Sequence, residues 1–283
     1  MNVTPRLTQP LKPELHPWIR TAARFGHIAV GLVYIVLGVV AFIGTLDVGV
    51  RPVGVQGSLR RVLESHAGTA FLAAIGFGLV TDGFWQGLRA VCNFDGVEAD
   101  VRGYLSRGSW VIVGIIHIAL GIVAIKLALG IRPEPTENQV QFWTKSIMAL
   151  HFGDWIILGG GIVAIIIGII FIGRAMAGNI DRWLDLSSVH RPIKIMIIML
   201  GRFGVAARGA VLMAAGTLFV LAVVHVNPQE AHGLGGTLRT IESHQYGHFL
   251  VASIALGFIA YGIFELALAG YRRIGIPTAG RKS

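Results

Sequence analysis

The chain has 283 residues, of which 54% are hydrophobic and only 14% are charged, and its formal net charge is +9. Soluble chains usually carry about 25% charged residues, so this composition excludes an ordinary water-soluble globule and predicts that lipid surrounds the fold. The single cysteine, Cys92, excludes an intrachain disulfide.

The chain begins with a polar segment, residues 1–22, that contains four prolines and that we expect on the cytoplasmic side. The hydrophobic stretch that follows has full membrane length and no convincing small-residue cleavage site. We therefore expect a retained transmembrane helix rather than a signal peptide that is removed.

One pattern then occurs three times: an arginine, a glycine seven residues later, and another glycine after seven more. The triplets are Arg24, Gly31 and Gly38; Arg107, Gly114 and Gly121; and Arg202, Gly209 and Gly216. A second apolar stretch follows each triplet and begins near Gly68, Gly153 or Gly247. A fixed period of this length indicates a repeated supersecondary unit. We expect three two-helix repeats, at 23–92, 106–178 and 201–273, in one membrane domain, followed by a cytoplasmic tail at 274–283.

Crossing the hydrocarbon core of a bilayer takes about twenty apolar residues of helix. We expect six such helices, at 26–46, 68–90, 109–130, 154–174, 203–226 and 247–270. All ten prolines lie outside these ranges, so each helix can satisfy its own backbone hydrogen bonds in lipid. The predicted fold is an all-α membrane protein whose six transmembrane helices form three pseudo-repeated helical hairpins.

The distribution of Lys and Arg predicts the orientation of these helices. The two termini and the loops on their side of the membrane carry sixteen of these residues, whereas the opposite loops carry seven. We expect a multi-pass protein of the bacterial cytoplasmic (inner) membrane with both termini in the cytoplasm. The same imbalance accounts for the net charge without a nucleic-acid partner. Membrane lipids, and other subunits of a membrane complex, are the expected partners.

Glycines seven residues apart lie on one face of a helix, and small residues let membrane helices pack closely. We interpret six glycines as packing stripes: Gly31, Gly38, Gly114, Gly121, Gly209 and Gly216.

The loop inside each repeat faces outward and holds a short amphipathic segment, at 59–64, 142–148 and 238–242, which predicts a helix on the membrane interface. A base recurs in each of these loops: Arg60, Lys145 and Arg239. These bases are headgroup anchors or an outer cationic ring on a pseudo-threefold axis. The repeat arginines Arg24, Arg107 and Arg202 would form the matching inner ring.

Asp82, Arg208 and Glu265 lie inside the predicted spans, all in the inner half. Charges at this depth are costly and are functional hypotheses by default. We predict an intramembrane charge network in which Arg208 pairs with Asp82 or Glu265, as a structural ion pair or as a proton or cation relay. His117 lies near mid-span with no obvious histidine partner at its level, which disfavours haem.

Histidines near the outer face are the candidate metal ligands: His66, His151, His244 and His248. His244 and His248 have the spacing of a metal half-site on a helix, but Gly247 lies between them where the last helix begins. We assign no metal with confidence and predict no cofactor. Nucleotide-binding, metalloprotease and serine-hydrolase motifs are absent from the sequence, so we assign no catalytic residue and do not expect an enzyme.

The repeats resemble a known family. Arg24-Phe25-Gly26 and Arg202-Phe203-Gly204 carry the likeness, and Ser106-Arg107-Gly108 is a looser middle copy. The chain is similar over roughly residues 20–273 to the bacterial membrane family called domain of unknown function 1206. The resemblance implies six spans in three pairs and a bacterial cytoplasmic membrane, and it implies no activity, substrate or catalytic residue. Mitochondrial carriers also have three two-helix repeats, but their proline–acid–base motif is missing here.

These features favour a non-enzymatic accessory or packing subunit of a membrane complex. The alternative is a transporter or channel for a small solute or ion along a pseudo-threefold axis, with anions favoured by the cationic rings. A metal-binding redox protein at the outer face is a third hypothesis.

Overall fold

The computed structural model describes residues 16–46, 68–93, 97, 100–131, 136–177, 184, 186–187 and 189–271. The helices in these residues are α1 (His16–Gly44), α3 (Gly68–Cys92), α4 (Val101–Ala128), α5 (Thr136–Met148), α6 (Gly153–Ala177), α7 (Arg191–Val224), the short 3-10 helix η3 (Pro228–Glu230), α8 (Leu234–Glu242) and α9 (Gly247–Tyr271). Six of them, α1, α3, α4, α6, α7 and α9, are long and apolar enough to cross a membrane. The all-α fold with six candidate spans is therefore confirmed.

Three helices begin well before the first residue of the predicted span. α1 starts at His16, α4 at Val101 and α7 at Arg191, because local signals continue each helix beyond the apolar stretch. The Asp100 side chain accepts a hydrogen bond from the Gly103 N–H and caps α4. Pro192 lies in the first turn of α7, where its missing N–H needs no partner. Hydropathy thus marks the lipid-crossing part of each helix, whereas the start of α4 depends on the Asp100 cap and that of α7 on Pro192.

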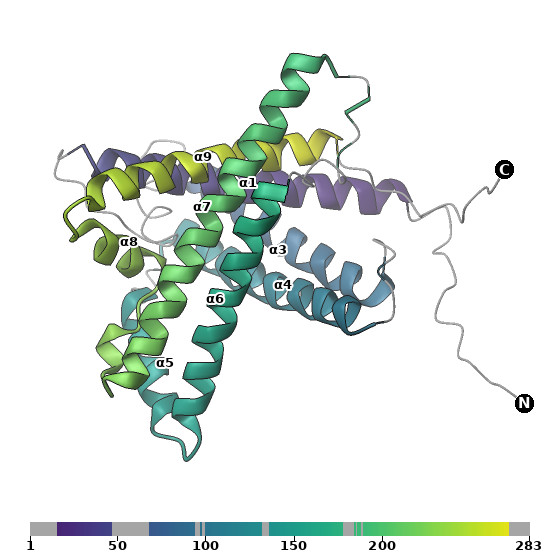
Figure 1. Cartoon of the computed structure of the whole chain (residues 1–283). Coiled ribbons are helices and arrows are strands. Elements are labelled where there is room, and N and C mark those ends of the chain that lie inside the picture. The colour runs from purple at the N-terminus through teal and green to yellow at the C-terminus, as the bar shows by residue number, and fades with distance from the viewer. Residues whose placement is uncertain are drawn as a thin grey trace, which may run out of the picture.

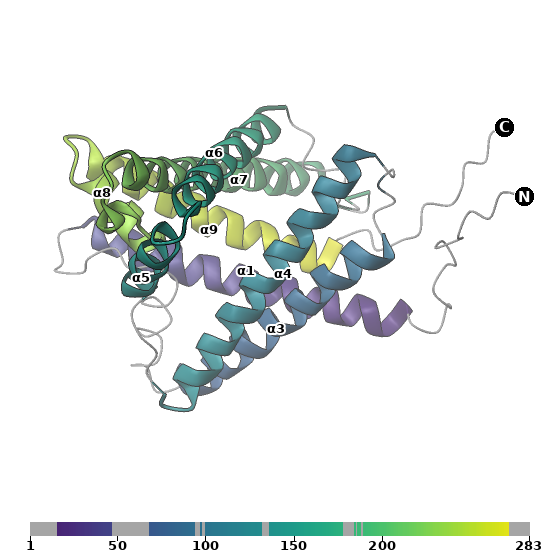
Figure 2. The ribbon, with the colours of Figure 1, turned by 90° about the horizontal axis from the view of Figure 1, so that it is seen from below.

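The most extensive helix contacts join different repeats. α3 packs along α4, α6 along α7, and α9 closes onto α1. Seen from below, these pairs lie in three layers with α1 and α9 in the middle (Figure 2). The outer pair α6 and α7 runs steeply across α1 and α9 (Figure 1). The contacts inside the repeats are smaller, between α1 and α3 and between α7 and α9, and α4 and α6 make no comparable contact among the described residues.

Glycines on both partners allow the close approach in each inter-repeat pair. A Cβ added to Gly209 would lie 2.7 Å from the Gly168 carbonyl oxygen, and one added to Gly114 would lie 2.8 Å from that of Gly83. Gly31 faces Gly262 in the same way. All six glycines of the predicted packing stripes lie in these three interfaces, against α9, α3 and α6 respectively.

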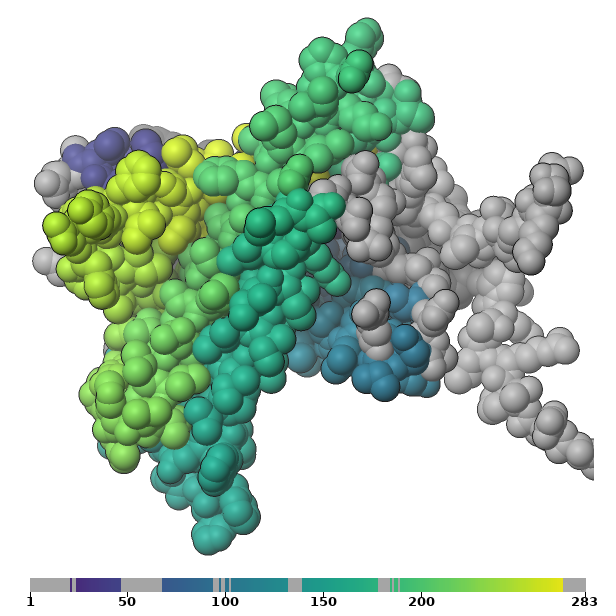
Figure 3. Space-filling view, viewed as in Figure 1, coloured from purple at the N-terminus to yellow at the C-terminus, as the bar shows by residue number. Residues whose placement is uncertain are grey.

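A second small-residue contact joins the two helices of the first and third repeats. A Cβ on Gly78 would overlap Ala29, and a Cβ on Gly257 would overlap Ala207. The second repeat has Ile112 and Val163 at the matching positions, and both are exposed. We attribute the lack of packing between α4 and α6 to the bulk of these two side chains, and Figure 3 shows α6 uncovered along one face of the molecule.

The short helices α5 and α8 lie at the end of the bundle opposite the start of α1 (Figure 1). The Gln141 side chain of α5 donates to the Gln229 carbonyl of η3, 3.3 Å away. Lys145 on α5 and Arg239 on α8 are both exposed there. Arg60 and the predicted amphipathic segment 59–64 lie outside the described residues.

The half of the bundle near α8 has an apolar core. We call it the outer apolar cluster, and its buried members are Leu37, Ala41, Val211, Leu238, Ile254, Ala255 and Phe258. Its side chains come from α1, α7, α8 and α9, so it closes the space between these helices at that end.

Candidate functional site

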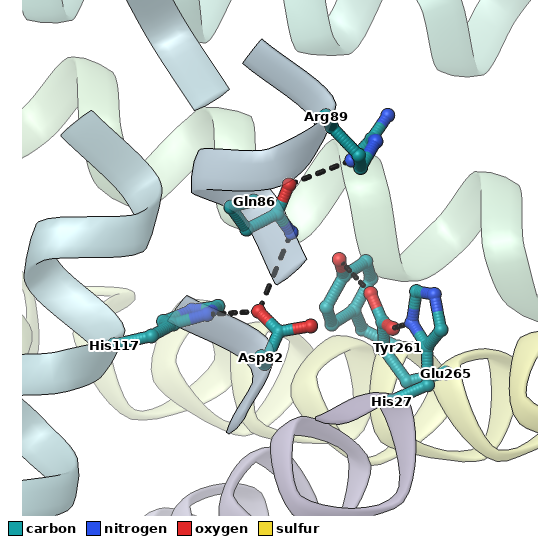
Figure 4. Close-up of polar contacts among 7 residues, drawn as sticks. All are labelled: His27, Asp82, Gln86, Arg89, His117, Tyr261 and Glu265. Atoms are coloured by element: carbon teal, nitrogen blue, oxygen red, sulfur yellow. Dashed lines mark hydrogen bonds and ion pairs between the residues drawn. The ribbon is translucent and has the colours of Figure 1, made fainter. Parts of the chain in front are cut away.

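Polar side chains gather in the other half of the bundle, toward the end where α1 begins and α9 ends. Figure 4 shows the seven residues that we call the polar network: His27, Asp82, Gln86, Arg89, His117, Tyr261 and Glu265. They come from α1, α3, α4 and α9, and all except His117 are buried. Polar groups at such depth in lipid must find partners in the protein.

Asp82 is the most deeply buried acid of the network, with 1% of its surface exposed. His117 Nδ1 donates to Asp82 Oδ2 over 2.6 Å, and Gln86 Nε2 donates to the same oxygen over 3.3 Å. Among the residues that the structure describes, Oδ1 has no hydrogen-bond partner. A Cβ on Gly26 would lie 2.7 Å from Oδ1, so the absent side chain makes room for the carboxylate against α1.

Glu265 is held by a second histidine in a different interface. His27 Nδ1 lies 2.6 Å from Glu265 Oε2, and the Tyr261 hydroxyl donates to Oε1. The His27 and Glu265 side chains are only 6% and 7% exposed. In Figure 4 the second oxygen of Asp82 faces the group formed by Tyr261, Glu265 and His27. The two acids therefore belong to one site.

A polar ladder leads from Asp82 toward the end of α3. Arg89 Nη1 donates to Gln86 Oε1 over 2.7 Å, and the Arg89 guanidinium lies 4.5 Å from the centre of the Trp110 ring. Asp82, Gln86 and Arg89 are three or four residues apart and lie on one helix face. The network thus extends to the side of the bundle where α3 ends.

Arg208 does not form the predicted pair. Among the described residues it makes no ion pair with Asp82 or Glu265, because both carboxylates are taken by histidines. Its guanidinium lies instead over three rings, at 4.4 Å from the centre of Tyr261, 5.1 Å from Tyr34 and 5.5 Å from Phe171. The two acids and the arginine meet in one region, but with different partners from those expected.

The repeat explains where the network lies. Asp82 and Tyr261 directly precede the repeated glycines Gly83 and Gly262, and each has its polar neighbour four residues later, Gln86 or Glu265. The two polar pairs occupy the same place in α3 and α9. The equivalent positions in α6, the second helix of the second repeat, are apolar and hold Ile167 and Phe171.

The facing helices follow the same rule. Tyr34 and His117 each lie ten residues after a repeat arginine, where the third copy has Leu212. Tyr34 meets Tyr261 edge-to-face with ring centroids 4.8 Å apart, just as His117 meets Asp82. Sequence reasoning predicted a network of Asp82, Arg208 and Glu265 but missed both histidine partners. Aligning the polar pairs of the second helices across repeats would have shown the shared position.

The other predicted site residues lie apart from this network. Arg202 caps α6, because its Nε donates to the Ala175 carbonyl over 2.6 Å and its Nη2 to that of Met176 over 2.8 Å. Arg24 is exposed and Arg107 half-buried. Among the described residues, no contact joins any two of these three arginines.

The candidate metal ligands each have local contacts. His244 Nδ1 donates to the Thr240 carbonyl over 2.8 Å, His248 lies 3.3 Å from Glu242, and His151 stacks on Phe152. His66 lies outside the described residues. Within the described ranges no group of three or more His, Cys, Asp or Glu side chains is placed to hold a metal ion.

Fold and site together define a multi-pass α-helical membrane protein built from three related two-helix repeats. The chain belongs to the family described as Domain of Unknown Function (DUF1206), which matches residues 25–93, 108–178 and 203–272. It is similar to the uncharacterized protein YxxB of Bacillus subtilis (strain 168), with 25% identity over 274 residues that cover 97% of this chain and 98% of YxxB. No solved structure matches the chain. The resemblance seen in the repeats is confirmed.

Proposed function

We propose that the protein is a non-enzymatic transporter that couples proton binding in the polar network to the movement of a small solute. The observation that carries the proposal is the Asp82 carboxylate. One of its oxygens is shared by His117 and Gln86, and the other is buried with no hydrogen-bond partner in the described part of the chain. A proton bound at this second oxygen would satisfy a buried charge that otherwise lacks a partner, and we take this oxygen as the position where a proton would couple to transport.

Histidine strengthens this interpretation, because it is the side chain that most readily changes charge near neutral pH. Each histidine–carboxylate pair also crosses a helix interface: His117 and Asp82 join α4 to α3, and His27 and Glu265 join α1 to α9. Protonation of either carboxylate removes the attraction across its interface. Proton binding is thereby linked to how the helix pairs pack.

The layout favours access from one side. The polar ladder through Arg89 reaches the end where α3 finishes, whereas the outer apolar cluster fills the opposite half. This arrangement fits a state that is open toward the network and closed beyond it. The pair α6 and α7 meets the remaining spans through α7 and α9, so it can move as a unit to exchange access.

The positive-inside rule gives the orientation that we propose. The ends of α1, α3 and α9 near the network would face the cytoplasm, and α5 and α8 would lie at the outer surface. The membrane would be the bacterial cytoplasmic membrane.

A flux assay tests the proposal. The purified protein is reconstituted in liposomes that contain a pH-sensitive dye, and monocarboxylates, inorganic anions, ammonium compounds and metal cations are added outside in turn. We expect at least one class to change the internal pH in a protein-dependent way. Asp82→Asn should slow this flux on the order of tenfold or more, because one charge-assisted hydrogen bond contributes about 1.5–3 kcal/mol.

The matched control is His225→Gln, which removes a histidine–carboxylate contact outside the network. His225 Nδ1 lies 2.9 Å from Glu230, with side chains 53% and 30% exposed, and its loss should leave the flux unchanged. Wild-type liposomes without any pH-linked flux, or equal flux through Asp82→Asn, would refute proton coupling.

A second role, as a subunit of a membrane complex, is favoured by the open face between α4 and α6. Ile112 and Val163 are 60% and 54% exposed where the other repeats have small residues in contact. An apolar helix of a partner membrane protein would cover this face. Mild extraction from native membranes should then recover the protein with a stoichiometric partner that Ile112→Trp displaces, and recovery as a lone monomer would reject this role.

A further inference from the structure

Arg208 has no assigned task in the proton-binding chemistry. It enters from α7, is half-buried, and places its guanidinium among Tyr34, Tyr261 and Phe171 from α1, α9 and α6. The α1–α9 pair and the α6–α7 pair therefore meet around the permanent positive charge of Arg208.

Helix packing does not require an arginine at this position. Val30 and Val113 occupy the same place in the first and second repeats, six residues after the repeat arginine. Val30 is buried in the hydrophobic core. The third repeat therefore carries a cation where its two relatives carry an aliphatic side chain.

Arg208 lies among aromatic rings and has no carboxylate within ion-pair distance among the described residues. The other charged and titratable groups near it and in the polar network are Asp82 and Arg89 on α3, His27 and Tyr34 on α1, His117 on α4, and Tyr261 and Glu265 on α9, whereas α6 contributes Phe171. Each acid already accepts from a histidine. A bound anion would therefore pair with Arg208 without displacing a carboxylate of the protein from it.

We propose that Arg208 binds the carboxylate of a small monocarboxylate, with the rings of Tyr34, Tyr261 and Phe171 as the wall against its apolar part. The planar guanidinium matches a carboxylate in a bidentate contact. A dianion is disfavoured, because Asp82 and Glu265 lie in the same site. The transport of this ligand rests on the proposed function, whereas its binding does not.

Thermal unfolding in detergent tests binding without any transport step. Propionate, present at about 100 times its dissociation constant, should raise the midpoint on the order of 5 °C. Chloride, inorganic phosphate and propylammonium at the same concentration are the comparison ligands and should raise it little.

Two variants locate the site. Arg208→Val takes the residue found in the other repeats, so it should fold and lose the propionate shift. Arg174→Gln removes an exposed arginine from the end of α6 and should keep the shift. If Arg208→Val does not fold, Arg208→Lys takes its place in the test. It keeps the charge but not the bidentate geometry, and it should weaken the propionate shift.

Several results would overturn the inference. Equal shifts from chloride, phosphate and propionate would show a site that reads charge alone. A shift with decanoate and none with propionate would assign the carboxylate to a lipid. Absence of any shift in the wild type, with a lowered midpoint in Arg208→Val, would make Arg208 a structural cation. Transport of another solute without propionate binding would reject this inference and support the proposed function. Propionate binding without any flux would support this inference and reject the proposed function.

Discussion

The two carboxylates that are buried among the described residues each face a histidine, and Arg89 and Arg208 have other neighbours. Asp82 and Glu265 meet His117 and His27 at 2.6 Å, whereas Arg208 stacks on aromatic rings. An arginine would stay charged at every accessible pH, but a histidine can release its proton. The two acids are therefore held by side chains that, unlike arginine, can also be neutral.

The α6–α7 pair supplies a test of the Asp82–His117 contact between α3 and α4, because it has Ile167 and Leu212 at the same two positions. His117→Leu should lower the free energy of unfolding by about 3–5 kcal/mol, since it leaves a buried acid without its partner. The double variant Asp82→Ile, His117→Leu should recover most of this loss, because an apolar pair of similar volume needs no charge compensation. Chemical unfolding in micelles measures both.

A double variant as unstable as the single one would show that the acid contributes through contacts other than the pair. Flux through the double variant should be lost in either case, which separates the stability of the pair from its use.

Much of the residue-scale site was predictable, and its pairing was not. Depth alone identified Asp82, Glu265 and Arg208, because charges are rare in lipid. The partners depend on α3 packing against α4 and α9 against α1, and the sequence near each acid carries no sign of which helix lies opposite. The expected Arg208 pair assumed nearness without that information.

At the scale of elements, the glycines that open α6 and α9 have a steric reason. A Cβ on Gly153 would overlap the carbonyl of Ile147, and a Cβ on Gly247 would overlap the carbonyls of Ile241 and Glu242. Each glycine lies where the chain turns sharply from a short interfacial helix into a span. The recurrence of this glycine was visible in the sequence, but its cause, the close approach to the preceding helix end, was not.

Gly247→Ala should therefore destabilise the protein by about 1–3 kcal/mol, because the added methyl group forces the α8–α9 turn apart. Gly270→Ala is the matched control near the other end of α9, where an added Cβ meets nothing within 4 Å. It should be neutral or stabilising by about 0.5–1 kcal/mol, since alanine favours a helix. Thermal unfolding of the two variants side by side decides the point, and equal midpoints would disprove the steric account.

For the whole molecule, the sequence predicted three equivalent hairpins, and the structure shows three inter-repeat pairs with one repeat opened. The glycine stripe of α1 could face either α3 or α9, because both present small residues at matching heights. Local spacing cannot choose between them. The choice is made by the full set of contacts, with Gly262 and Ala255 of α9 on one side of α1 and Gly78 of α3 on another.

The open second repeat also follows from particular side chains. Ala29–Gly78 and Ala207–Gly257 hold the first and third repeats closed, and Ile112 and Val163 replace them in the second. We therefore expect Ile112→Ala with Val163→Gly to let α4 and α6 approach. The gain comes from packing between the backbones, which drives helix association in lipid.

Spin labels at Ser106 and Ile170 report this approach, since the matching residues of the third repeat, Gly201 and Phe264, are in contact. Cys92 is replaced by serine in both proteins so that only the two labels react. The distance between the labels should be shorter and more narrowly distributed in the double variant than in the otherwise wild-type protein. An unchanged distance would mean that bulk at 112 and 163 does not hold the repeat open, and that the orientation of α6 and α7 across α9 fixes the gap instead.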